Sequence, residues 1–335
     1  MNLPWIKSEL HGLMSSVSAG SHALLVTGVQ GIGKRALAEQ FAALRLCEGP
    51  SEKGPCGQCR GCHLMSAGTH PDVIILEPSR EDIAPQEDET SGQKKGKVSQ
   101  FITVDQVRAL LGCLELASHS GRGRVVIADP ADQLNAAAAN ALLKTLEDPP
   151  SETIFLLITS QEKRLAITVR SRCRRVPVGC PAWDVSLAWL KTQDVDNPES
   201  LLRLAGGAPL RALAMGKSGI TQHWHRLVQW LTPGAVRDLD WDTTTTGLAQ
   251  LCHLLQVLCV DLSRLRTGED GMYSGADDSA LRQAALRLRP EAISDFWIGL
   301  NKTKALIQHP LNGALVRDEL LLTLDRLIAQ SRRAH

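Results

Sequence analysis

The chain has 335 residues, 43% of them hydrophobic, so it is long enough to bury a substantial core in two or three domains. Its 37 basic and 36 acidic residues leave a formal net charge of +1, which excludes a general attraction to nucleic acid or anionic membranes. The sequence has neither the apolar run of about 18 residues that a membrane span needs nor the start of a signal peptide. We therefore expect a cytoplasmic protein, in which the nine cysteines serve a purpose other than disulfide formation.

The first half of the chain alternates short apolar runs with helical patterns. The runs are rich in β-branched residues and have the length of strands, which is typical of a parallel sheet covered on both faces. They comprise residues 22–27, 72–77, 124–129 and 153–159. Helical patterns begin near Lys34 and cover residues 104–117 and 136–147, the last one ended by two prolines. This alternation predicts an α/β domain over residues 1–179, with phosphate chemistry at the carboxyl ends of its strands.

The rest of the pattern is polar or helical. Residues 80–100 are charged and polar with one Ile and one Val, so we expect a mobile loop there. After about Gly179 the strand patterns stop, and three short helical patterns predict a small lid domain over residues 180–217. Residues 218–335 repeat apolar side chains at i, i+3, i+4 and i+7, which predicts a C-terminal all-α domain.

The segment GVQGIGKRALAEQ, which begins at Gly28, has the Gly-x-x-x-x-Gly-Lys spacing of a loop that holds nucleotide phosphates. Backbone N–H groups and a helix N-terminus favour an anion there, and the ammonium of Lys34 adds a positive charge. The candidate binding residues are Gly28, Gly31, Gly33 and Lys34. An ordinary glycine-rich turn is the alternative, and the strand that precedes the loop makes it the weaker interpretation.

Two residues argue against hydrolysis at this loop. Arg35 occupies the position of the Ser or Thr whose hydroxyl would ligate magnesium, and its guanidinium would repel that ion. A second motif should place an Asp and a catalytic Glu after another strand. Asp129 is in the right place, although such an Asp is often only a turn residue, and Pro130 follows it and cannot polarise a water. Magnesium-assisted hydrolysis is therefore predicted to be absent or very slow.

Four cysteines lie close together at Cys-x8-Cys-x2-Cys-x2-Cys spacing. Four thiolates at this spacing predict a structural, tetrahedral zinc site in a module over residues 47–62. The ligands would be Cys47, Cys56, Cys59 and Cys62. A redox pair would explain only two of the four thiols, and His63 could replace one of them. The scattered cysteines are expected to be small buried apolar side chains; they are Cys113, Cys173, Cys180, Cys252 and Cys259.

Six cations fall in the thirteen residues KRLAITVRSRCRR, from Lys163 to Arg175. A solvated charged surface is one interpretation of this cluster. A contact with a phosphate on a neighbouring molecule is the other, and the residues alone favour neither.

The motifs resemble, as an ordered set, the bacterial clamp-loader subunits of the AAA+ class. The set comprises the altered phosphate loop, the cysteine insertion, THPDV, ITVDQVR, AAAANALLKTLEDPP and SRCR. The resemblance covers the first two thirds of the chain closely, and in the tail it rests on helical character and length. It implies an AAA+ P-loop α/β domain with an inserted zinc module, a helical lid and an all-α collar for oligomerisation.

In that family, five AAA+ subunits form an open ring that places the sliding clamp on primed DNA. The resemblance implies that this chain is the ring's stator, an accessory subunit of the DNA-directed DNA polymerase III complex, a nucleotidyltransferase, with no activity of its own. Its partners would be the motor subunits gamma or tau, the delta subunit, and, through the complex, the sliding clamp and primed DNA. Zinc would be its structural cofactor, while the retained Lys34 leaves ATP binding open.

The same resemblance implies roles for particular residues. VRSRC is similar to the family's Ser-Arg-Cys motif, which makes Arg172 an arginine finger that reaches ATP bound by the adjacent subunit. Thr159 and Ser160 fall at the family's first sensor position. In hydrolysing members a sensor arginine occupies the position that is Leu210 in this chain, and Arg211 is one residue further along. The sensor role is therefore not assigned to Arg211.

Two other functions are alternatives. An active motor ATPase of the same loader is disfavoured by Arg35 and Pro130. A zinc-dependent DNA-binding protein without partner subunits would need a basic stripe with interleaved aromatic residues, whereas the chain is near neutral and 4% aromatic. For residues 218–335, the apolar helical faces predict a domain that holds the ring together, with a self-contained bundle as the alternative.

Overall fold

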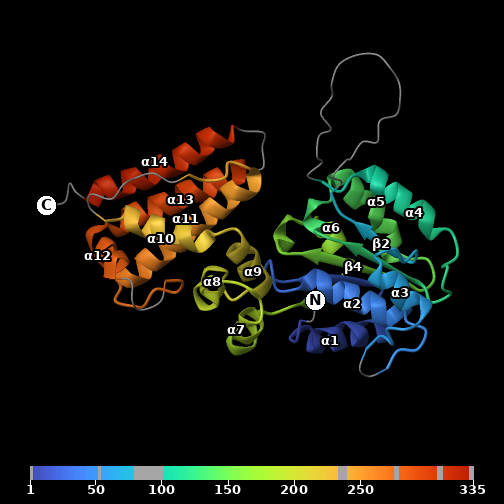
Figure 1. Cartoon of the computed structure of the whole chain (residues 1–335). Coiled ribbons are helices and arrows are strands. Elements are labelled where there is room, and N and C mark those ends of the chain that lie inside the picture. Colours follow the sequence, from blue (N-terminus) through green and yellow to red (C-terminus); the bar gives the residue numbers. More distant parts are fainter. Residues whose placement is uncertain are drawn as a thin grey trace, which may run out of the picture. The chain divides into compact units, whose positions relative to one another are not determined.

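Figure 1 shows the computed structural model, which describes residues 3–51, 54–78, 101–232, 240–274, 279–307 and 312–331. The chain divides into two compact units, Met1–Pro181 and Ala182–His335. The loop predicted over residues 80–100 lies outside the described residues.

A five-stranded parallel sheet forms the centre of the first unit. In chain order its strands are β1 (Ala23–Thr27), β2 (Val73–Leu76), β3 (Arg124–Ala128), β4 (Thr153–Thr159) and β5 (Arg174–Pro177), and in space they follow the order β2-β3-β4-β1-β5. Every residue of β1, β3 and β4 is buried, which explains their continuous apolar runs. The four predicted strands are confirmed. The sequence did not indicate β5, a four-residue edge strand with exposed arginines.

Helices alternate with these strands and cover the sheet on both sides (Figure 1). They are α1 (Ile6–Ser18), α2 (Lys34–Leu46), α3 (Arg60–Ser66), α4 (Val104–Leu114), α5 (Ala136–Glu147) and α6 (Ile167–Arg170), with 3₁₀ turns η1 (Ala131–Gln133) and η2 (Glu162–Arg164). Local sequence sets where two of the helices begin. Thr103 forms a reciprocal capping box with Gln106 at the start of α4, and Asn135 accepts from the backbone N–H of Ala138 at the start of α5.

The main core of the first unit lies between the sheet and the pair α4 and α5. Side chains of both helices meet alternate residues of the strands, because successive strand residues point to opposite faces. The cluster includes Val107, Leu110, Leu142 and Leu146 from the helices and Leu25, Val126, Phe155 and Leu157 from the strands. The opposite face is covered by α2, which packs on β3 and β4 and against α1.

The described part of the second unit is helical, as the sequence predicts. Its helices are α7 (Trp183–Lys191), α8 (Pro198–Leu204), α9 (Pro209–Lys217), α10 (Ile220–Trp230), α11 (Thr245–Arg266), α12 (Ser279–Arg287), α13 (Pro290–Leu306) and α14 (Gly313–Ser331). The first three pack on one another, and α11 packs against α12, α13 and α14. A division between a lid and a collar near Lys217 stays a prediction. The predicted fold class is confirmed: a parallel α/β domain is followed by a part whose described elements are all helices.

Helix α11 is long and apolar enough, by length and composition alone, to cross a membrane. However, 67% of its most apolar window is buried inside the protein. The central helix of a soluble bundle has the same properties, so α11 is weak evidence for a membrane span.

Candidate functional site

The residues that follow the strands meet at one edge of the sheet. Parallel strands bring their carboxyl ends together, so the phosphate loop after β1 lies beside the residues that follow β2, β3 and β4. Two glycines let the loop fold tightly. A Cβ on Gly28 would lie 2.4 Å from the carbonyl oxygen of Val178, and Gly33 has φ +98°, with Leu3 only 2.9 Å from the position of its Cβ. The loop predicted from the sequence is therefore present, between a strand and the N-terminus of α2.

Lys34 is buried, and its ammonium contacts the chain itself. The Nζ donates to the carbonyl oxygens of Gly28 at 2.8 Å and Val29 at 2.7 Å. It also donates to the hydroxyl of Ser160 at 2.9 Å. Burial lowers the pKa of Lys34, while the charges of Asp129 and other neighbours act in the opposite direction. The cation is thus positioned at the loop, as the motif requires, but its donors are engaged by oxygens of the protein.

Arg35 lies among three carboxylates at the same edge. Its Nε donates to Glu39 at 2.7 Å. Its Nη1 is 3.5 Å from Asp129 and 3.6 Å from Glu77, the residues that follow β3 and β2. Burial raises the pKa of Asp129, and the charge of Arg35 opposes that change. The guanidinium therefore pairs with carboxylates, the kind of group that usually ligates magnesium in proteins.

Thr159 and Ser160, at the end of β4, also contact this edge. The hydroxyl of Thr159 donates to Asp132 at 2.5 Å and accepts from the backbone N–H of Gln161. Ser160 accepts from Lys34. The family resemblance indicated both Thr159 and Ser160 but not Asp132. An Asp in a polar turn after a buried strand was the only signal available for it.

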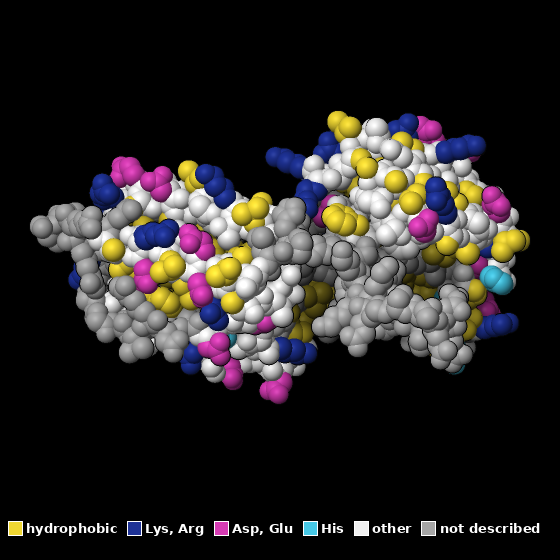
Figure 2. Space-filling model, turned by 90° about the horizontal axis from the view of Figure 1, so that it is seen from above, with side chains coloured by type: hydrophobic (Ala, Val, Ile, Leu, Met, Phe, Trp, Pro, Cys, Tyr) yellow, Lys and Arg dark blue, Asp and Glu magenta, His cyan; other side chains and the backbone are white. Residues whose placement is uncertain are grey.

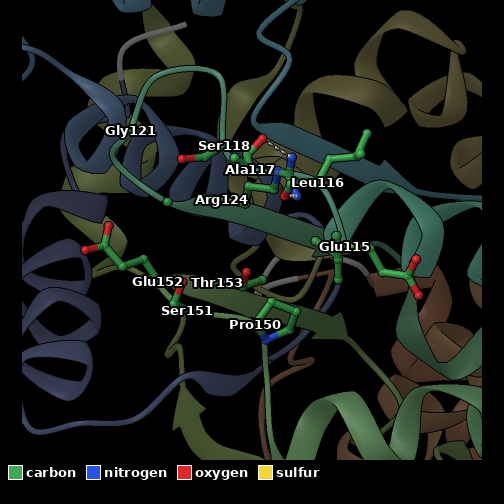
Figure 3. Close-up of a pocket in the computed structure, with 12 residues that line it drawn as sticks. Glu115, Leu116, Ala117, Ser118, Gly121, Arg124, Pro150, Ser151, Glu152 and Thr153 are labelled. Carbon is green, nitrogen blue, oxygen red and sulfur yellow. Dashed lines mark hydrogen bonds between the residues drawn. The ribbon is translucent and has the colours of Figure 1, made fainter.

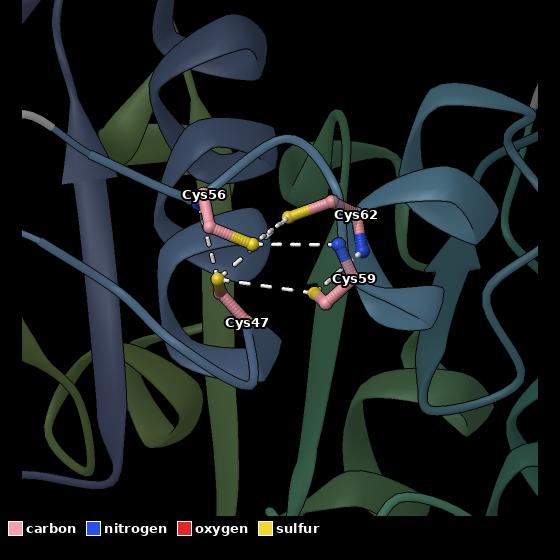
Figure 4. A group of neighbouring side chains, drawn as sticks. All are labelled: Cys47, Cys56, Cys59 and Cys62. Atoms are coloured by element: carbon pink, nitrogen blue, oxygen red, sulfur yellow. Dashed lines mark hydrogen bonds between the residues drawn. The ribbon is translucent and has the colours of Figure 1, made fainter.

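The four cysteines of the predicted zinc module converge (Figure 4). Their sulfur atoms all lie within 4.8 Å of one another, so the cluster could hold a metal ion. The Sγ of Cys47 lies 3.7 Å from that of Cys62 and 3.9 Å from that of Cys59. A tetrahedron with metal–sulfur bonds of about 2.3 Å has edges of about 3.8 Å, so the geometry fits four-coordinate zinc.

Backbone N–H groups point at the same sulfur atoms. Those of Cys56, Gly57 and Cys62 approach a cysteine Sγ at 3.2 to 3.4 Å. Such donors stabilise thiolates, the form that binds a metal. Backbone hydrogen bonds at Gln58 and Cys59 lower the pKa of Cys56 to about 6, whereas burial raises the pKa of Cys62 to about 12.

The cysteine module is joined to the sheet through the THPDV segment. Asp72 is fully buried and accepts from the backbone N–H groups of His119 and Ser120, both at 2.8 Å. It also pairs with Arg124 at 3.7 Å, and its own N–H donates to Nδ1 of His70. The Nε2 of His70 lies 3.7 Å from the position of a Cβ on Gly61 in the module. These residues therefore hold the module and the loop before β3 in place.

The remaining cysteines only partly follow the prediction. Cys252 and Cys259 are buried in α11, and burial raises the pKa of each. Cys173 is half-buried beside the core of the first unit. The prediction is wrong for Cys113 and Cys180, which are exposed. Cys113 lies on the solvent side of α4, and Cys180 follows the edge strand β5, where the sheet ends.

Arg172 lies just after the short helix α6 in the first unit. Its backbone N–H donates to the carbonyl of Val169, which is fully buried, so its main chain is anchored. Its side chain is 30% exposed and contacts Glu147 and the carbonyl oxygen of Thr168. Arg174 and Arg175 are exposed on β5. On the face drawn in Figure 2, Lys and Arg side chains are interspersed with Asp and Glu, and no continuous basic stripe is visible there.

A family model described as "DNA polymerase III, delta subunit" matches residues 8–179. The DNA polymerase III subunit delta' of Pseudomonas aeruginosa is 39% identical over 230 residues, which are 68% of this chain and 65% of that protein. The chain belongs to the DNA polymerase III delta-prime family. The Yersinia pestis subunit delta' is 37% identical over 96% of this chain and 93% of its own length. The Escherichia coli subunit tau is 25% identical over 86% of this chain and 47% of its own length.

Arg211 lies on α9 of the second unit, next to Leu210. Burial lowers the pKa of Arg211, and Tyr273 opposes that change. Its predicted lack of a sensor role stays a prediction.

The first unit also has a cavity of about 470 Å³ at the opposite edge of its sheet, lined by the first residues of β3 and β4 (Figure 3). Arg124 lines it, but this guanidinium donates to the carbonyl oxygens of Cys113, Leu116 and Ala117 at 2.6 to 2.8 Å. Arg124 thus serves the structure of the loop before β3, and the cavity is unlike a phosphate site.

Proposed function

We propose that this chain is the stator subunit of a bacterial DNA polymerase III clamp loader. In this role it hydrolyses no ATP itself and supplies Arg172 as an arginine finger to an adjacent ATPase subunit. The observation that carries the proposal is the placement of Arg35 among Glu39, Glu77 and Asp129, in a chain whose relatives are delta-prime subunits.

The contacts at the phosphate loop support the loss of hydrolysis. A working site uses a carboxylate and a hydroxyl to hold magnesium and a second carboxylate to orient the attacking water. Here Arg35 pairs with Asp129, and Pro130 stands where the second carboxylate should be. The loop then serves to shape the domain, and the nucleotide chemistry belongs to a neighbour.

The position of Arg172 supports the role of a finger. A guanidinium is permanently charged and can contact two phosphate oxygens at once, which stabilises the charge that develops as the phosphoryl group transfers. Arg172 is partly exposed on an anchored turn, so its side chain is accessible without any unfolding of the core. Fingers supplied by another subunit accelerate hydrolysis by roughly 10³- to 10⁵-fold at their own site.

The partners follow from the same assignment. They are the motor subunits gamma or tau, the delta subunit, and, through the complex, the sliding clamp and primed DNA, all in the cytoplasm. In this role the four-cysteine cluster would hold a zinc ion, and that ion would be structural, because four protein thiolates leave no open position for catalysis.

The test is steady-state ATP turnover of the loader reconstituted with clamp and primed DNA. Arg172→Ala should leave assembly and zinc content intact but silence the nucleotide site at one interface. Arg172→Lys should fail almost as badly, since one ammonium cannot make the two-point contact. Arg174→Ala is the matched control, because Arg174 is exposed on the adjacent strand. Unchanged turnover with Arg172→Ala would show that this arginine is only surface charge.

A further inference from the structure

Glu147, the last residue of α5, lies against the guanidinium of Arg172. Its Oε1 accepts from the Nε of Arg172 at 2.6 Å and also contacts Nη2. The carbonyl oxygen of Thr168 accepts from Nη1 at 2.9 Å. All three nitrogens of the guanidinium therefore have a partner within the chain.

These contacts leave part of the guanidinium available. A guanidinium carries five N–H groups, one on Nε and two on each terminal nitrogen. Within the part of the chain that the structure describes, Glu147 and Thr168 account for one N–H on each nitrogen, which leaves one on Nη1 and one on Nη2. Two N–H groups on neighbouring nitrogens are what a two-point contact with a phosphate requires. The arginine is thus held by its own chain and can still bind an anion.

We propose that Glu147 is a positioning residue for Arg172, which holds the guanidinium in the orientation that meets the terminal phosphate of a nucleotide bound by an adjacent subunit. This inference rests on the proposed function, in which Arg172 supplies that contact.

The protein beneath the pair is rigid, as positioning requires. Leu146, which precedes Glu147, and Val169, whose carbonyl oxygen accepts from the backbone N–H of Arg172, are buried in the core between the sheet and the helices. Helices α5 and α6 pack directly against each other. Pro149 and Pro150 follow Glu147 closely and prevent α5 from continuing. The two side chains therefore project from fixed backbone positions and not from a mobile loop.

Glu147 has two opposing effects on a phosphate that approaches Arg172. Its negative charge repels the phosphate, but its side chain is 53% exposed, so water and salt weaken this repulsion. It also restricts a long side chain that would otherwise sample many rotamers, and solvent does not screen this effect. Orientation therefore outweighs repulsion, and removal of Glu147 should slow the reaction that depends on Arg172.

The test measures ATP turnover of the reconstituted loader, with clamp and primed DNA, over a range of ATP concentrations. The turnover that depends on Arg172 is the difference between the rate of the unmodified loader and that of the Arg172→Ala variant. We expect Glu147→Ala to lower the kcat of that contribution roughly 5- to 30-fold. KM should change little, since the neighbour binds the nucleotide. Glu147→Gln should recover part of the loss, because its amide oxygen still accepts from Arg172.

A double variant separates positioning from a general structural effect. If Glu147 acts through Arg172, Arg172→Ala with Glu147→Ala should turn over as slowly as Arg172→Ala alone. A further loss in the double variant would contradict the proposal. Glu162→Ala is the matched control, since Glu162 pairs with Arg175 at 3.0 Å in the same region, and it should leave turnover unchanged.

The remaining outcomes are distinct. Faster turnover with Glu147→Ala would make Glu147 an inhibitory latch and overturn the positioning role. A loss with Arg172→Ala but none with Glu147→Ala would reject the inference and leave the proposed function standing. If Arg172→Ala itself has no effect, the proposed function fails. If the Glu147→Ala variant does not assemble, turnover of the Glu147→Lys variant is the deciding measurement. An exposed lysine extends into solvent, so this variant should lose at least as much turnover as expected for Glu147→Ala.

Discussion

The ammonium of Lys34 donates a hydrogen bond of 2.9 Å to the hydroxyl of Ser160, which joins the first residue of α2 to the end of β4. Two further bonds, to Gly28 and Val29, engage the remaining donors of Lys34. A phosphate could contact this ammonium only by replacing bonds that the loop already makes. Oxygens of the protein therefore already bind the ammonium of Lys34. A nucleotide phosphate would have to compete with them for this ammonium.

The isolated chain should hydrolyse ATP no faster than the buffer background. Lys34 is engaged by the loop, and Arg35 neutralises Asp129, so neither phosphate nor magnesium meets its usual ligands. Phosphate release by the purified chain is the measurement. Turnover that disappears in Lys34→Ala would establish a working site and overturn the stator assignment. As a gain-of-function comparison, Arg35→Thr with Pro130→Glu should bind nucleotide in a magnesium-dependent manner, measured by titration calorimetry.

The chain should contain one zinc ion when it is purified without added metal. The four sulfur atoms have the spacing of a tetrahedral site, and the short glycine-rich module lacks apolar area to hold itself together. Metal analysis tests the content, and Cys59→Ser should reduce it, whereas Cys113→Ser should not, since Cys113 lies outside the cluster on α4. Absence of zinc, or a disulfide among these cysteines under reducing conditions, would refute the assignment.

The elements that can be predicted from the sequence are those encoded by residues close together in the chain. Strands β1, β3 and β4 are buried on both faces and therefore read as unbroken apolar runs. The edge strand β5 is held by pairing with β1, and its exposed arginines resemble a charged surface. Only the three-dimensional pairing identifies such a strand.

The same distinction applies to the site. The cysteine cluster and the phosphate loop are each encoded within a few residues, so their spacing was sufficient. The partners of the two key arginines come from elsewhere in the chain. Glu77 reaches Arg35 because parallel strands end at one edge, and Glu147 reaches Arg172 because α5 packs on α6. No periodicity or motif connects residues that are brought together only by the packing of separate elements.

The second unit should lose stability as the pH falls from about 6.5 towards 4. His253 of α11 lies 2.9 Å from the carbonyl oxygen of Leu204, and burial, followed by the charge of Arg211, lowers the pKa of His253 to about 4. The unfolded chain has a histidine pKa of about 6.5, so between these values only the unfolded state binds the proton. The free energy of unfolding therefore has its full value above about pH 6.5 and decreases by about 2–3 kcal/mol between that pH and about pH 4.

Urea unfolding at pH 7.5 and pH 4.5 measures this effect. Tryptophan fluorescence reports on the second unit, because all tryptophans except Trp5 lie there. His253→Gln should lose less stability between the two pH values than the unmodified chain does, since its amide can donate to Leu204 at both. An equal loss in the two proteins would assign the acid sensitivity to other groups.

The C-terminal helices should hold the chain in its complex. Large apolar side chains of α13 and α14 are exposed, among them Leu306, Leu315 and Leu322. Leu315 and Leu322 are seven residues apart and therefore lie on one face of α14, away from the buried Leu320 and Leu324. An apolar stripe of this kind is typical of a surface that a partner covers.

Leu315→Asp with Leu322→Asp should weaken binding to the partner subunits roughly 10- to 100-fold, because each charge would be buried against an apolar surface. Folding should be retained, since both side chains are already in contact with water. Sedimentation or titration with the purified partners gives the Kd, and circular dichroism checks the helices. Leu116→Asp is the matched control, as Leu116 is 69% exposed in the first unit and should leave the Kd unchanged. If a chain that ends at Lys217 still assembles with its partners, the second unit beyond α9 is a self-contained bundle and the interface lies elsewhere.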